Sequence, residues 1–544
     1  MKLVIEPRYY RWAAGLFFAV YVIICLIGSY QTSFAERDSY RVFTGIMDAF
    51  NENKPISGYF VYGYGVSKGY FLALDQLRPF ALDPNTLSRL LNYITIFCVL
   101  GMALLVCCTS TVVAGRRAGL FAMFALTIVP VWFYVGQSAH PMWPGMLLFL
   151  LAIFLSQKMC ASTGFVAKSA WGVAAALSLA LALSARLDVV LMAPMLLGLC
   201  FNGDRIDYLK FGQIFGMGVG SLVLFAICSL LVLPAAQPGA VDGSALTLLL
   251  EWHNLDRFVR YAGMAQLRFA RAFNPALIIL MIIATLHFVR SGRWAILAFT
   301  VPTILLNYLF WIPNAQPERH FLYMAPAVAI LIGGYIAEAT EAVDWPKPGI
   351  DGFLAIAGLC SALAMLCALA WPGTFLLYTG GFAFLLMGLA PGLRKGRFLA
   401  VAFLGFGLLS LGMAALPSKY LLANPYSKDE PHQIAQLADE IAKIPALNRP
   451  LIVISDGYPI ASRLLADRKD GFQLRSIDGN WLVGRSHHND VELLIQGWSV
   501  PLAWGPLVER VKKGQAYFII DRRVAPELAE RIRSLSEFRE IQLP

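Results

Sequence analysis

About thirteen apolar segments, most of them of the length a membrane-spanning helix requires, lie within the first 417 of the 544 residues. A helix that crosses the hydrocarbon core needs about 20 mainly apolar residues, within a range of about 17–25. Lipid offers no hydrogen bonds to the backbone, so segments of this kind form helices. The segments are 11–30, 88–108, 117–135, 142–157, 168–184, 188–201, 210–235, 273–289, 294–311, 321–338, 351–371, 373–391 and 397–416. The sequence therefore predicts an all-α polytopic membrane domain over residues 1–417, in which 142–157 and 188–201 are short enough to be tilted, broken or buried in protein.

The remaining residues, 418–544, have a different composition. They hold 33 of the 78 charged residues, although charged residues make up only 14% of the whole chain, against about 25% in a typical soluble domain. Short apolar runs at 451–455, 517–521 and 538–542 alternate with helical patterns at 430–444, 458–466 and 525–534. For the whole chain, the low share of charged residues excludes a soluble enzyme, a disordered protein and a disulfide scaffold. The composition of residues 418–544 predicts a small α/β soluble domain after the membrane domain.

Basic residues indicate the orientation in the membrane. With the N-terminus in the cytoplasm, fifteen lysines and arginines fall on the cytoplasmic side, whereas the short outer loops hold only two, Arg186 and Arg319. The net charge of +10 is then topological, and no nucleic-acid partner is expected. We predict a multi-pass protein of the bacterial cytoplasmic membrane with residues 418–544 outside the cytoplasm. A cleaved signal peptide is the alternative reading of 11–30, and an uncleaved anchor is favoured because its apolar run is long.

Two outer loops, 31–87 and 236–272, are longer than a connection needs, which is typical of functional loops. Just after the first span, Glu36 and Asp38 place carboxylates at the membrane surface, where a general base for a hydroxyl group could act. The alternative for Asp38 is a helix N-cap, because a helical pattern follows it. Segment 59–77 mixes aromatic residues with Lys68, and we expect a helix that lies at the interface or is re-entrant, with Lys68 as a candidate contact for a lipid phosphate.

The second long loop contains arginines with helical spacing. At 100° per residue they share one face within about 80°, with apolar residues among them. They are Arg257, Arg260, Arg268 and Arg271. Recognition of a lipid-linked phosphate and ordinary interfacial anchoring both account for this pattern.

Short outer turns carry the remaining candidates. Arg319 begins a span, and its planar guanidinium suits an anionic substrate. Arg186 and Asp188 either pair with each other, anchor a helix end or line a substrate cavity, and His140 is either structural or part of that cavity. The full set of candidate cavity residues is Tyr40, Tyr62, Tyr64, His140, Arg186, Asp188, Glu318 and His320.

Three stretches of sequence together resemble the GT-C superfamily of polytopic glycosyltransferases, which includes protein O-mannosyltransferases and lipid A aminoarabinose transferases. They are ERDSYRVF at 36–43, ALSARLDVVLMAPMLL at 182–197 and PERHFLYMAPAVAIL at 317–331, within roughly residues 1–340. The resemblance implies a polyprenyl-phosphate-linked sugar donor, and a lipid, glycan or protein acceptor outside the cytoplasm. It implies Asp38, or its neighbour Glu36, as catalytic base, inversion at the sugar, and a donor phosphate held by Arg319, Lys68 or the loop arginines.

The chain lacks the WWDYG motif and the second acidic motif of oligosaccharyltransferases. We therefore expect a hexosyl- or pentosyltransferase without a metal or other cofactor, although a divalent cation stays possible on the sequence alone. Two other functions remain open: a flippase or transporter of lipid-linked saccharide, and a ligase or polymerase of surface polysaccharide. A flippase would place charges deep within spans, whereas the charges here lie at span ends and in outer loops.

Overall fold

The computed structural model describes residues 64–80, 84–127, 139–203, 205–231, 275–311 and 318–341, four strands between 451 and 520, and isolated positions up to residue 273. The chain divides into two compact units. The first comprises Met1–Tyr30, Asn92–Val232 and Ala245–Pro425, and the second Gln31–Leu91, Leu233–Ser244 and Tyr426–Pro544. The predicted spans 351–371, 373–391 and 397–416 lie outside the described residues, as do most of 11–30 and the tail helices.

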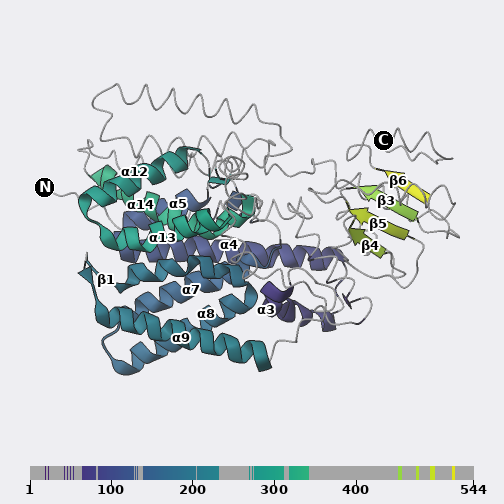
Figure 1. Ribbon diagram of the computed structural model, residues 1–544, viewed down its shortest axis with the longest axis horizontal. Coiled ribbons are helices and arrows are strands. Elements are labelled where there is room, and N and C mark those ends of the chain that lie inside the picture. The colour runs from purple at the N-terminus through teal and green to yellow at the C-terminus, as the bar shows by residue number, and fades with distance from the viewer. Residues whose placement is uncertain are drawn as a thin grey trace, which may run out of the picture. The chain divides into compact units, whose positions relative to one another are not determined.

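Long apolar helices make up the first unit (Figure 1). Their bounds are α4 (Pro84–Ala114, which begins in the second unit), α5 (Arg116–Thr127), α7 (Met142–Ala161), α8 (Phe165–Ala185), α9 (Tyr208–Leu231), α12 (Pro275–Ser291), α13 (Trp294–Trp311) and α14 (Ala325–Glu341). The 3₁₀ helices η3 (Leu187–Cys200) and η5 (Glu318–Met324) and the hairpin β1 (Phe201–Asn202) and β2 (Arg205–Ile206) complete it. Within the described residues, six helices are long and apolar enough to cross a membrane. A polytopic helical domain is therefore confirmed over this part of the chain.

Two predicted spans differ in detail. The segment 117–135 does not run through as one helix, because α5 ends at Thr127. The segment 188–201 forms the 14-residue η3, a 3₁₀ helix with Pro194 inside it. A 3₁₀ helix rises about 2.0 Å per residue, so η3 is about 28 Å long. A segment too short to cross as an α-helix therefore reaches nearly across a hydrocarbon core of about 30 Å.

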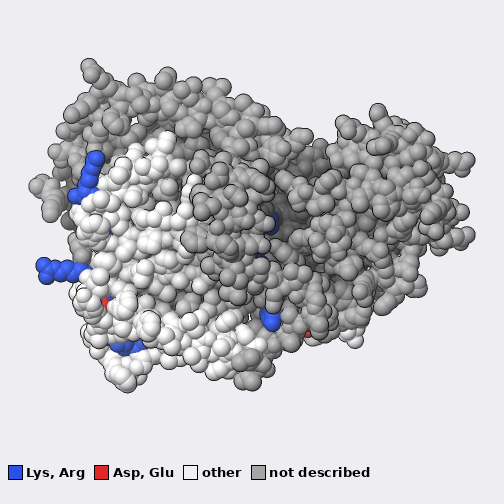
Figure 2. Space-filling model, in the orientation of Figure 1, with Lys and Arg blue, Asp and Glu red and all other residues white. Residues whose placement is uncertain are grey.

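The helices differ widely in how much protein surrounds them. In the span that includes α14, 94% of the most apolar window is buried, against 17% for α9. The helix α7 packs on α8, α8 on α9, and α5 on α14 (Figure 1). Figure 2 shows the described outer surface of the helices as mostly uncharged, with most of the visible Lys and Arg side chains near the left end of the view. This distribution suits helices whose outer faces meet lipid.

The contact between α5 and α14 depends on Gly333. A Cβ atom added there would lie 2.5 Å from the Ala122 nitrogen and 2.7 Å from the Ala118 oxygen, which are backbone atoms and cannot rotate away. At the adjacent Gly334, the nearest atom would be a Phe288 ring carbon at 3.4 Å, an ordinary contact. Small residues thus allow the two backbones to approach closely, as is common between membrane helices.

We expect Gly333→Ala to destabilise the protein by about 1–3 kcal/mol, because the added methyl group forces α5 and α14 apart. Gly334→Ala is the matched control, and it should be neutral or slightly stabilising, because alanine favours a helix over glycine. Thermal unfolding of the purified protein in detergent measures both. Equal midpoints for the two variants would contradict the close-packing argument.

In the second unit, four parallel strands form a sheet in the order β4-β5-β3-β6. They are β3 (Leu451–Ser455), β4 (Gln473–Ser476), β5 (Val491–Ile495) and β6 (Tyr517–Ile520). The strands β3 and β6 match the predicted runs at 451–455 and 517–521, whereas β4 and β5 were not predicted. Parallel neighbours need crossover connections of a dozen residues or more, and the spacing along this chain provides them. The α/β class of residues 418–544 stays a prediction, because its helices fall outside the described residues.

Candidate functional site

Arg186 and Asp188 form a buried ion pair at the corner between α8 and η3. The helix α8 ends at Ala185, Arg186 is extended with φ −161°, and Asp188 lies in the first turn of η3. The Asp188 Oδ2 atom accepts hydrogen bonds from the Arg186 Nε at 2.9 Å and from a terminal nitrogen at 2.6 Å. Their side chains are only 14% and 6% exposed. Of the alternatives that the sequence left open for these two residues, mutual pairing is present, and a place in a substrate cavity stays a prediction.

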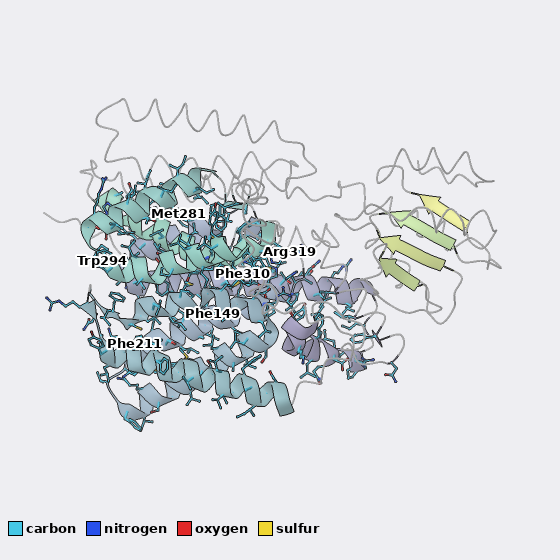
Figure 3. All side chains as sticks on the ribbon, in the orientation of Figure 1. Phe149, Phe211, Met281, Trp294, Phe310 and Arg319 are labelled. Atoms are coloured by element: carbon cyan, nitrogen blue, oxygen red, sulfur yellow. The ribbon has the colours of Figure 1, made fainter. Side chains whose placement is uncertain are left out.

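The late 3₁₀ helix η5 brings two more polar side chains to this corner. The Tyr323 hydroxyl, 1% exposed at the residue level, lies 3.5 Å from the same Asp188 oxygen and donates to it, although 135 residues separate the two. Arg319, one helical turn before Tyr323, acts on the Tyr323 phenol through its charge, as Arg186 does. The Arg319 Nε atom is buried. Figure 3 shows Arg319 and Phe310 at the same end of the helices, with Trp294 at the other end. We call Arg186, Asp188, Tyr323 and Arg319 the arginine cluster.

Among its described side chains, the arginine cluster contains two guanidinium groups and one carboxylate. Burial opposes the charge of Arg186, but the nearby Asp188 carboxylate outweighs burial, so the pKa of Arg186 lies above its ordinary value. Guanidinium groups keep their proton in proteins, so each arginine of the cluster is a cation. Two guanidinium groups at the end of apolar helices are a favourable place for an anion.

Aromatic rings lie beside the cluster. The rings of Trp311 and His320 are 4.4 Å apart between centroids, and Phe310 meets Trp311 edge to face. The Trp311 indole nitrogen is buried and makes no hydrogen bond in the described part of the chain. His320, predicted for a substrate cavity, therefore lies against an aromatic surface next to Arg319.

His140 has a structural contact at the start of α7. It is 5% exposed, and its Nδ1 accepts a hydrogen bond from the Met142 backbone nitrogen at 3.2 Å. Gly145, one turn later, lies against the arginine cluster: an added Cβ would come within 3.0 Å of the Arg186 Cβ. The first turn of α7 thus supports the corner that carries Arg186.

The segment that follows Asp38 is helical at its described positions. Val42, Ile46 and Ala49 are all helical and buried, with the spacing of one helical face. Arg78 donates a hydrogen bond to the Ala49 carbonyl oxygen at 3.0 Å. Arg78 also pairs with Asp75 at 2.6 Å, so it joins the end of this helix to the end of α3 (Tyr64–Asp75). The helical pattern predicted after Asp38 is therefore found at the described positions, as an N-cap role of Asp38 requires.

Lys68 lies in α3, within the second unit, and is half-buried. It follows Ser67, where non-helical backbone angles kink the helix. The prediction that 59–77 contains a helix is confirmed for 64–75.

Several predicted site residues lie outside the described residues or have no described side chain. They are Glu36, Asp38, Tyr40, Tyr62, Tyr64, Arg257, Arg260, Arg268, Arg271 and Glu318. Among the residues that the structure does describe, no group of three His, Cys, Asp or Glu side chains is arranged to hold a metal ion. Sequence reasoning missed Tyr323, whose only signal was its position one helical turn after Arg319.

No protein-family model matches this chain, and no curated protein matches it. Among solved structures it is similar to ArnT from Cupriavidus metallidurans bound to undecaprenyl phosphate, with 14% identity and a TM-score of 0.45 over 97% of this chain and 96% of that chain. It is also similar to an Archaeoglobus fulgidus oligosaccharyltransferase tethered with an acceptor peptide, with 12% identity and a TM-score of 0.44 over 85% of this chain and 63% of that one. Both neighbours are GT-C superfamily membrane glycosyltransferases.

Proposed function

We propose that this protein is a membrane glycosyltransferase that moves one sugar from a polyprenyl-phosphate donor to an acceptor outside the cytoplasm. The observation that carries the proposal is the arginine cluster: Arg186 and Arg319 come together beside Tyr323, at the end of helices long and apolar enough to cross a membrane. A lipid phosphate is the anion that reaches such a place, because its chain lies in the hydrocarbon while its charge stays at the helix ends. The cluster thus suits the phosphate that links lipid and sugar.

In the proposed reaction, Asp38 takes the proton from an acceptor hydroxyl, and the acceptor oxygen forms a bond to the anomeric carbon of the sugar. The bond from that carbon to the phosphate oxygen breaks, and the polyprenyl phosphate leaves with the electron pair. A single displacement inverts the sugar. Arg319 holds the phosphate as its negative charge grows, which is the kind of electrostatic stabilisation that contributes most to many enzymes. Asp188 orients Arg186 and Tyr323 beside it.

The Arg319→Ala variant tests the phosphate site. We expect sugar transfer from a defined undecaprenyl-phosphate sugar to fall by about 10²–10³-fold, as for loss of one donor to a developing negative charge. Arg319→Lys should recover only part of the activity, because lysine keeps the charge and loses the planar fork. The assay uses the full-length protein in detergent or liposomes, with and without EDTA, because we also propose that transfer needs no metal.

Arg293→Ala is the matched control. Arg293 pairs with Glu338 at 2.6 Å, is 50% exposed, and lies in the turn just before Trp294, at the opposite end of α13 from the arginine cluster. Its loss should leave transfer unchanged. Equal losses in the Arg319 and Arg293 variants would contradict a phosphate site at Arg319. Movement of the lipid-linked sugar across liposomes without transfer would replace the enzyme with a flippase.

A further inference from the structure

The 3₁₀ helix η3 contains a backbone carbonyl group that cannot make the regular hydrogen bond of a 3₁₀ helix. In a 3₁₀ helix each carbonyl oxygen accepts a hydrogen bond from the nitrogen three residues later. For Leu191 that residue is Pro194, which has no N–H group. Leu191 itself is buried, and every residue of η3 after Asp188 is apolar, so we do not expect water to provide the missing donor.

Asn307 of α13 supplies that donor. Its side-chain nitrogen Nδ2 lies 3.0 Å from the Leu191 oxygen and 2.8 Å from the Thr303 oxygen. Both neighbours are carbonyl oxygens, and this fixes which end of the amide faces them. Asn307 is fully buried, with 0% exposure, in a helix apolar enough to cross a membrane. A buried amide in such a helix is costly and is expected to have a specific role.

The bond from Asn307 reaches the turn of η3 next to the arginine cluster. Leu191 follows Asp188 by three residues, which is one turn of a 3₁₀ helix. Asp188 in turn contacts both Arg186 and Tyr323. A shift of this turn would therefore move the carboxylate that orients both side chains, without touching the cluster itself.

We propose that Asn307 is a positioning residue of the donor site, which it serves by replacing the backbone N–H that Pro194 lacks. That this site binds the sugar donor rests on the proposed function, whereas the positioning role of Asn307 rests on the described hydrogen bonds. Asn307 holds the first turns of η3 in the conformation in which Asp188 meets Arg186 and Tyr323.

The first measurement compares Asn307→Leu, which has nearly the same shape, with the wild type. We expect the KM for the undecaprenyl-phosphate sugar to rise about tenfold with an unchanged KM for the acceptor, because one unsatisfied buried carbonyl group displaces η3. A merely structural role would reduce the amount of active protein and leave both KM values unchanged. Thr303→Val is the matched control: the Thr303 hydroxyl is buried one turn away on α13 and makes no hydrogen bond among the described residues.

The second measurement is a rescue. Pro194→Ala restores a backbone N–H that can bond the Leu191 oxygen within η3. The double variant Asn307→Leu/Pro194→Ala should therefore recover the donor KM, and Pro194→Ala alone should stay close to the wild type. An equal defect from Asn307→Leu with and without Pro194→Ala would overturn the proposal, as would a defect of the same size in Thr303→Val.

Binding of undecaprenyl phosphate without sugar separates this inference from the proposed function. Weaker binding in Asn307→Leu with recovery in the double variant supports positioning, even if the wild type transfers no sugar, in which case only the proposed enzyme fails. If the wild type transfers sugar while Asn307→Leu binds and reacts as the wild type does, the positioning role fails and the enzyme stands.

Discussion

Asp38→Asn should lower the turnover of sugar transfer by about a thousandfold, within the about 10²–10⁴-fold that general base catalysis contributes. The amide cannot accept the proton of the acceptor hydroxyl, although it has nearly the same size as the carboxylate. Turnover with saturating undecaprenyl-phosphate sugar and acceptor measures the effect. The donor KM should change little, because the phosphate is held by the arginine cluster rather than by Asp38.

The same substitution separates the two roles of Asp38. Asparagine caps a helix about as well as aspartate does, so an N-cap function survives Asp38→Asn and the fold stays intact. Asp38→Ala loses both the cap and the base, and it should cost about 1 kcal/mol of stability in addition. Glu36→Gln is the control for its neighbour. Full turnover in Asp38→Asn together with a loss in Glu36→Gln would transfer the role of base to Glu36.

Asp188→Leu should destabilise the protein by about 3–5 kcal/mol, because it leaves the Arg186 guanidinium buried without its carboxylate. Unfolding of the purified protein in detergent, followed by heat or denaturant, measures the loss. Donor affinity should fall as well, because Tyr323 loses its acceptor and Arg186 its orientation.

The double variant Arg186→Met/Asp188→Leu shows whether this pair stabilises the fold or serves the site. Replacing a whole buried ion pair by apolar groups of similar volume is often neutral or stabilising. We therefore expect the double variant to regain most of the stability lost in Asp188→Leu, while its affinity for undecaprenyl phosphate stays low. Equal stability of the single and double variants would show that Arg186 is not buried as a charge.

Prediction from sequence succeeded where the information is local. The helix α13 has the bounds that its apolar run 294–311 predicted, because the length of such a run is set by the bilayer rather than by neighbours. Prediction was less accurate where packing between helices decides the local structure. For 188–201 it left open whether the segment is tilted, broken or buried. The structure shows a 3₁₀ helix that contains Pro194 and accepts a hydrogen bond from Asn307, which lies more than 100 residues further along the chain.

The residues of the candidate site divide in the same way, into those that the sequence indicated and those that it did not. Arg186, Asp188 and Arg319 stood out from the sequence because charges are rare between apolar runs. Tyr323 and Asn307 did not stand out, because the role of a tyrosine or asparagine within a span cannot be inferred until its partner is known. Their partners, Asp188 and the Leu191 carbonyl, are 135 and 116 residues away in the chain.

By itself, the sequence determined a chain of membrane-spanning helices with a few charged residues in the outer loops, since apolar length and charge placement are properties of single segments. The tertiary structure decided that Arg186, Asp188, Tyr323 and Arg319 come together in one cluster. It also decided that Gly333 marks the close contact of α5 with α14. Both results depend on which helices meet, and that choice is made by packing between segments far apart in the chain.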